Sequence, residues 1–196
     1  MKFYKALVKL LSPIHSIYSV KGLKAVFSIL LLFFLANCHS LEVIPEPNLT
    51  QFTIKSKPIC LKWNWHPFCL ETKPNSLTIR GILENSNLEH KIYLDYYLDS
   101  YDSDIPVGVS LLIDGTYYNL RKAGTEYTDT LKIRSEISED IVKKIQKTKK
   151  TISMSYSNRK ETLNFEFSSG ETDDFKNYLK EVTDKIKSLK KMKIVQ

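Results

Sequence analysis

Residues 91–98 read K-I-Y-L-D-Y-Y-L, and this stretch decides the fold because apolar and polar side chains alternate along it. One face of the segment carries Ile92, Leu94, Tyr96 and Leu98. The opposite face carries Tyr93, Asp95 and Tyr97, and Asp99, directly after the segment, continues it. A period of two is the signature of a half-buried strand, so the stretch predicts an antiparallel sheet with one face on the core.

Short apolar stretches on both sides of this segment predict further strands, at residues 52–54, 77–82, 107–113, 116–120, 127–133, 151–156 and 161–167. Asp114-Gly115 stands between two of them and predicts a tight hairpin. Gly81, inside a strand pattern, is interpreted as a β-bulge.

Two helices are predicted in the second half of the chain. The shorter helix begins after Ser138, an N-cap residue type, with acids in its first turn and lysines later. The longer helix covers residues 172–190, and its apolar stripe consists of Phe175, Tyr178, Leu179, Val182, Ile186 and Leu189. The predicted fold is therefore α+β: an antiparallel sheet or sandwich with one short helix and a long C-terminal amphipathic helix.

The N-terminus has the layout of a cleaved export signal. Residues 25–36 are twelve uncharged residues, which as a helix span roughly 18 Å, well short of the ~30 Å hydrocarbon core. Five lysines and no acid precede this run. Residues 1–37 are therefore predicted to be a signal peptide and not a permanent membrane span.

Leu35-Ala36-Asn37-Cys38 resembles the lipobox of bacterial lipoproteins, and the long leader with Asn37 resembles those of spirochaetes. The resemblance implies that Cys38 becomes diacylated and forms the mature N-terminus, which anchors the chain to a membrane of the cell envelope. His39, where an Asp would signal inner-membrane retention in enteric bacteria, favours the outer membrane. The alternative is an ordinary secreted protein that is cut nearby.

Charge and length describe what remains after such a cut. Five of the 29 basic residues and none of the 22 acidic ones precede Cys38, so the remaining 159 residues carry 24 basic and 22 acidic side chains. This balance argues against a nucleic-acid partner. Residues 38–50, with two prolines, are predicted to form the lipidated cysteine and a tether, and residues 51–196 a single globular domain.

Cys60 and Cys69 are predicted to form a disulfide, since such bonds persist in exported proteins. The bridge would stabilise the fold by about 2.5–3 kcal/mol on the chain-entropy model. A metal site with His66, and with His90 as a further ligand, is the rival interpretation. Zinc sites usually separate their cysteines by two to four residues, whereas eight intervene here, so we predict neither metal nor cofactor.

The polar face of residues 93–101 is the candidate binding face for a protein partner. It comprises Tyr93, Asp95, Tyr97, Asp99 and Tyr101. Tyrosine is enriched in binding surfaces, although an ordinary solvated strand face has the same pattern. Asp99, Asp102 and Asp104 are an alternative Ca²⁺ site, but the loop lacks the glycine and glutamate of an EF-hand.

Two other clusters have structural interpretations that we prefer to functional ones. Trp63 and Trp65 are interpreted as core residues beside the disulfide and not as a stacking platform for a ligand. The lysines at the end of the long helix complement its dipole, and contact with anionic lipid is the alternative. They are Lys185, Lys187, Lys190, Lys191 and Lys193.

The end of the chain resembles the invasion-associated locus B family of exported bacterial proteins. The resemblance covers residues 137–179, including D-I-V-K-K-I-Q-K-T-K-K-T-I-S-M-S-Y and L-N-F-E-F, where a lysine-bearing helix, two strands and a final helix follow one another. The cysteines that precede the helix in that family are missing here, and the resemblance implies no activity.

No nucleophile elbow, P-loop, dinucleotide-binding glycine motif or histidine-rich metal motif occurs in the sequence. We therefore predict a non-enzymatic envelope lipoprotein that binds a macromolecular partner: a host molecule if it faces outward, or an envelope component if it faces the periplasm. An envelope enzyme or enzyme inhibitor with dispersed site residues is the second hypothesis, and a purely structural tether is the third.

Overall fold

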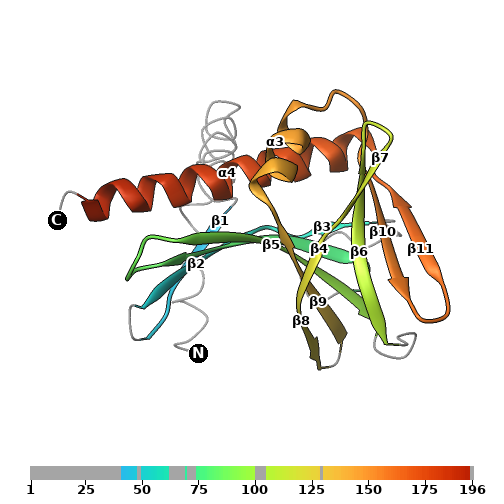
Figure 1. Cartoon of the computed structure of the whole chain (residues 1–196), viewed down its shortest axis with the longest axis horizontal. Helices are drawn as coiled ribbons and strands as arrows, with labels where there is room; N and C mark the ends of the chain where they lie inside the picture. The colour runs from blue at the N-terminus through green and yellow to red at the C-terminus, as the bar shows by residue number, and fades with distance from the viewer. Residues whose placement is uncertain are drawn as a thin grey trace, which may run out of the picture. The chain divides into compact units, whose positions relative to one another are not determined.

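The structure is a computed structural model that describes residues 41–47, 50–61, 69, 74–99, 105–128 and 130–194. The predicted signal peptide, Cys38, Trp63, Trp65 and His66 lie outside these residues. Ser40–Gln196 is one unit of the chain, described here by itself. Its described residues form two antiparallel sheets and two helices, which confirms the predicted α+β class (Figure 1).

The first sheet has the strand order β1-β2-β4-β5-β9-β8, and the short β3 also pairs with β4. Its strands are β1 (Leu41–Pro45), β2 (Gln51–Ser56), β3 (Ile59–Cys60), β4 (Ser76–Glu84), β5 (His90–Asp99), β8 (Arg121–Tyr127) and β9 (Thr130–Ile137). The second sheet has the order β11-β10-β6-β7. Its strands are β6 (Pro106–Ile113), β7 (Thr116–Asn119), β10 (Ser153–Asn158) and β11 (Thr162–Glu166). The helices are α3 (Glu139–Lys147) and α4 (Ser169–Ile194).

Strand β1 lies within the segment that was expected to be a tether. Leu41 pairs with Ser56, and Pro45 pairs with Phe52. The apolar side chains of Leu41 and Val43 pack against the core, and this burial explains why residues 41–45 join the sheet. Residues 41–45 are therefore part of the sheet and not of a tether.

Strand β5 carries the residues that join the two sheets. Tyr96 is fully buried, and its ring centroid lies 5.9 Å from that of Tyr156 in β10 and 5.8 Å from that of Phe165 in β11. Its hydroxyl donates a hydrogen bond to Asn75 Oδ1 at 3.0 Å. Burial, followed by the neighbouring Tyr156, raises the pKa of Tyr96, which therefore stays neutral.

The hairpin predicted at Asp114-Gly115 is confirmed between β6 and β7. Both residues have positive φ, 52° and 84°, as a tight two-residue turn between twisted strands requires. Thr148, which follows α3, donates its hydroxyl to Asp114 Oδ1 at 2.8 Å, so the turn also fixes the end of the helix.

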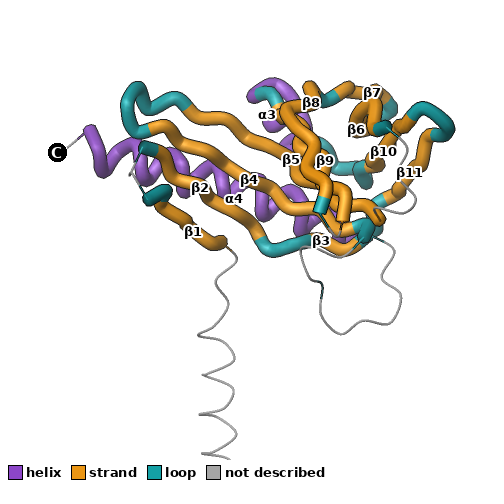
Figure 2. Tube along the Cα trace, turned by 90° about the horizontal axis from the view of Figure 1, so that it is seen from below, coloured by secondary structure: helices purple, strands orange, loops and turns teal. Residues whose placement is uncertain are grey.

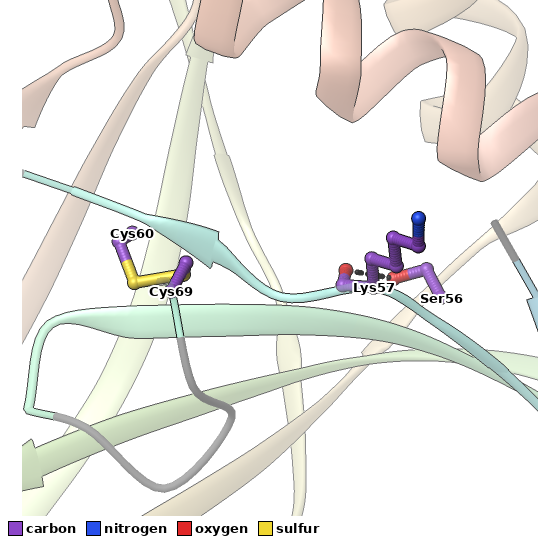
Figure 3. Close-up of a disulfide and its surroundings, with 4 residues drawn as sticks. All are labelled: Ser56, Lys57, Cys60 and Cys69. Carbon is purple, nitrogen blue, oxygen red and sulfur yellow. Dashed lines mark hydrogen bonds between the residues drawn. A yellow bond between two sulfur atoms is a disulfide. The ribbon is translucent and has the colours of Figure 1, made fainter. Parts of the chain in front are cut away.

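The disulfide between Cys60 and Cys69 is confirmed, with Cα atoms 5.6 Å apart (Figure 3). Cys60 ends β3, which continues along β4 the pairing that β2 begins. At the end of β2, Ser56 Oγ accepts the backbone N–H of Ile79 at 2.9 Å and donates to the carbonyl of Lys57 (Figure 3). The serine side chain thus satisfies a buried backbone donor where the strand is interrupted.

Helix α4 begins three residues earlier than its apolar stripe predicts. Ser168 Oγ accepts the N–H of Glu171, and Glu171 Oε2 accepts the N–H of Ser168, which is a capping box. The stripe residues Phe175, Leu179 and Val182 are fully buried. Figures 1 and 2 show α4 lying along one face of the β1-β2-β4 part of the first sheet. Among the described residues, no helix combines the length and the apolar character needed to cross a membrane.

Gly81 in β4 permits the close approach of α4 and does not mark a bulge. The pairing of β4 with β2 and with β5 runs through Gly81 without a shift in register. A Cβ atom at this position would lie 2.7 Å from Ile186 Cδ1 and 2.8 Å from Val182 Cγ1. The missing side chain is therefore what lets the helix pack directly on the strand.

We predict that Gly81→Ala lowers the free energy of unfolding by about 1–3 kcal/mol, because the added methyl group overpacks the contact with α4. Urea denaturation measures this change. Gly108→Ala in β6 is the matched control, since nothing lies within 4 Å of its added Cβ. Equal effects of the two substitutions would contradict the close-approach interpretation.

Candidate functional site

Two of the three described side chains of the predicted binding face are buried. Tyr93 is half-buried, whereas Asp95 is 0% and Tyr97 is 5% exposed. Asp99 ends β5, but its side chain is not described, and Tyr101 lies outside the described residues. Tyr93, Asp95 and Tyr97 lie on the face of β5 opposite the buried Leu94 and Tyr96. Asp95 and Tyr97 are nevertheless buried, although the alternating pattern predicts that they face solvent.

Two arginines hold the carboxylate of Asp95. Arg134, directly opposite on β9, donates from Nε to Oδ1 at 2.8 Å and from Nη2 to Oδ2 at 3.2 Å. Arg80 of β4 donates from Nε to Oδ2 at 2.9 Å. The hydrogen bond to Asp95 is the main cause that raises the pKa of Arg134, and burial opposes it. A buried carboxylate requires such pairing, so the role of Asp95 is to stabilise the sheet and not to contact a partner.

The ion-pair network continues outward from Arg134. Glu126 of β8, which is 52% exposed, accepts from Lys132 and lies 3.6 Å from Arg134 Nη2. The guanidinium of Arg134 also lies 5.9 Å from the centroid of the Tyr93 ring. The network links β4, β5, β9 and β8, which assigns it a role in holding these strands together.

We predict that Asp95→Ala lowers the free energy of unfolding by about 3–5 kcal/mol, because two partly buried guanidinium groups lose the fully buried carboxylate that both of them bind. Glu126→Ala, which removes the half-exposed carboxylate of the same network, should cost less than about 1 kcal/mol. Urea denaturation of both variants tests this difference. A cost for Asp95→Ala no larger than that for Glu126→Ala would contradict the structural role.

An open groove lies between α3 and α4, beside the start of β5, and has a volume of about 500 Å³. Its floor is aliphatic and contains Ile92, Val142 and Ile186. Five lysines line it: Lys143 and Lys147 on α3, and Lys180, Lys187 and Lys190 on α4. We call this feature the lysine groove.

The charges of the lysine groove are unbalanced and largely solvated. Against five lysines, its lining contains two carboxylates, those of Glu139 and Asp184. Lys187 Nζ lies 3.6 Å from Asp184 Oδ1, with both side chains more than half exposed. Exposed pairs of this kind contribute little to stability, so the lysines remain available to a ligand.

Hydrogen bonds join the two helices at one end of the groove, and His90 of β5 lies between them at the other end. At one end, Gln146 Nε2 donates to the carbonyl of Lys176, and Lys176 Nζ donates to the carbonyl of Thr148, each at 2.8 Å. At the other end, His90 Nδ1 lies 2.9 Å from Lys190 Nζ, and His90 Nε2 lies 4.0 Å from Glu139 Oε1. The groove is therefore formed before any ligand arrives.

His90 makes one end of the groove sensitive to pH. Burial, followed by the charge of Lys190, lowers its pKa, and Glu139 partly opposes this shift. Between the unfolded value of about 6.5 and the lower folded value, the unfolded chain binds more protons than the folded one. The free energy of unfolding therefore falls as pH drops through this window.

We predict that the stability advantage of the wild type over His90→Gln shrinks as pH falls from about 7.5 to about 5.5, because glutamine does not titrate. Thermal unfolding across this range measures the difference, and carboxylates shared by both proteins cancel in it. A difference that grows as pH falls would mean that the folded protein favours the charged imidazole, contrary to the geometry.

The alternative metal sites receive no support from the part of the chain that the structure describes. Within it, no three His, Cys, Asp or Glu side chains are placed together to hold a metal ion. Cys60 and Cys69 are joined to each other. His66, Asp102 and Asp104 lie outside the described residues, so the interpretations that depend on them stay untested.

Sequence reasoning missed the lysine groove, although α4 carried a signal for it. Lys180, Thr183, Lys187 and Lys190 follow helical spacing and form a second stripe beside the buried one. That stripe indicates a separate helix face. Which element lies opposite it depends on the position of α3, which the sequence pattern does not specify.

Comparisons of the chain with protein-family models, with curated proteins and with solved structures find no match. Function is therefore inferred from the residues of the domain itself.

Proposed function

We propose that the chain is a lipid-anchored protein of the cell envelope, with the outer membrane as its favoured location. It acts by binding a macromolecular partner and not by catalysis. The anchor rests on the twelve-residue apolar run that ends at the lipobox-like Leu35-Ala36-Asn37-Cys38. The binding role rests on the lysine groove, whose aliphatic floor and charged rim suit the burial of a ligand surface. The groove is the observation that carries this proposal.

The start of β1 supports display of the domain close to a membrane. Leu41 begins β1, three residues after Cys38. Three residues of extended chain span roughly 10 Å, so a lipid on Cys38 would keep the domain next to the headgroups. Two acyl chains on one cysteine supply the double hydrophobic signal that stable anchoring needs.

We predict that Cys38→Ala abolishes acylation and releases the domain from membranes, because the thiol that carries the lipid is gone. Detergent phase partitioning and mass analysis of the wild type and the variant, expressed in a bacterium with lipoprotein processing, measure this. The wild type should gain the lipid mass and lack residues 1–37. A variant that still partitions into detergent after its leader has been removed would contradict the anchor.

A further inference from the structure

Building on the proposed binding function, we infer that the lysine groove binds an acidic amphipathic segment of a partner protein. In this arrangement, apolar side chains of the segment enter the groove toward Val142, Ile92 and Ile186. Its carboxylates flank this apolar stripe and meet the lysines on both walls. This is the helix-in-groove mode of recognition, with charge complementarity added at the rim.

The charge of the lining selects an acidic occupant. The groove carries five lysines against two carboxylates, and the two carboxylates, Glu139 and Asp184, are 75% and 56% exposed. Two lysines come from one wall and three from the other. A basic segment would face like charges on both sides, whereas an acidic one gains from both.

The distribution of the lysines favours a peptide over a lipid with a single headgroup. Gln146 and Lys176 close one end of the groove through their hydrogen bond. Lys147 follows Gln146 directly on α3, and Lys180 lies one helical turn after Lys176 on α4, so both lysines are near this end. Lys190 contacts His90 at the opposite end. A single anionic headgroup needs cations gathered at one end, whereas these lysines are spread along the whole length. Spread charges match carboxylates repeated along a peptide.

The dimensions of the groove also fit such a segment. Lys180 and Lys190 are ten residues apart on α4, which corresponds to about 15 Å along a helix axis. A partner helix of about ten residues has the same length. A volume of about 500 Å³ accommodates the few apolar side chains that one helix face presents over that distance.

The test uses the full chain, expressed with its own leader and reconstituted in nanodiscs of zwitterionic phospholipid. The probe is a short fluorescein-labelled helical peptide with leucines at positions i, i+4 and i+7 and glutamates beside them. One control peptide has the same composition in scrambled order, and another has alanine in place of leucine. Fluorescence anisotropy measures binding, and hydrogen exchange detected by mass spectrometry locates it.

A pair of charge reversals on the protein provides the matched comparison. Lys147→Glu with Lys180→Glu changes the groove, whereas Lys149→Glu with Lys191→Glu makes the same change in net charge at lysines that do not line it. The groove pair should weaken binding of the probe about tenfold or more, and the outside pair less than about twofold. All four lysines are exposed or peripheral, so we expect both variants to fold.

The inference predicts that the acidic peptide protects the amides of α3 and α4 from hydrogen exchange. High salt should weaken binding of this peptide, and the two control peptides should bind more weakly than it does. The inference is overturned if the peptide does not bind, if both charge-reversal pairs weaken binding equally, or if protection appears elsewhere. Binding of palmitate or of phosphatidylglycerol vesicles through Lys147 and Lys180, without binding of the peptide, would assign the groove to lipid and also overturn it. Failure of the lipid anchor shows instead in the partitioning of Cys38→Ala, which does not involve the groove.

Discussion

The packing of α4 against the first sheet is the contact on which the rest of this domain depends. Gly81 has no side chain, and Val182 and Ile186 occupy the space that a Cβ would need. This contact sets the height of the helix above β4. Because α3 is bonded to α4 through Gln146 and Lys176, the same contact also positions the second helix. The position of the lysine groove between the two helices therefore depends on the absence of a side chain at Gly81.

The sequence predicted those elements whose side chains obey one dominant period. The alternation of residues 91–98 identified β5, and the stripe from Phe175 to Leu189 identified α4. Strand β8 was missed because its residues, R-K-A-G-T-E-Y, show no apolar alternation at an exposed edge. The stretch 127–133 predicts one strand, whereas in the structure β8 ends at Tyr127 and β9 begins at Thr130. Local patterns do not report pairing that tertiary context imposes.

The candidate site was harder to predict because its two parts depend on contacts between distant segments. Asp95 alternates like a solvated residue, and its burial follows from Arg80 and Arg134, fifteen and thirty-nine residues away. On each helix separately, the dipole is a sufficient explanation for the lysines near its C-terminal end. The lysines line one groove because the two helices lie antiparallel, with His90 at one end of the groove and Thr148 at the other.

Native-state hydrogen exchange tests most directly whether α4 is an integral part of the core. Amides of residues 175–186 in α4 and of 77–83 in β4 should share one opening free energy, equal to that of global unfolding, since neither element buries its apolar side chains without the other. Both sets should therefore merge into a single cooperative transition as denaturant is added. Helix amides that open at a free energy well below that of the β4 amides would show that α4 detaches independently, and would contradict a groove that is formed in advance.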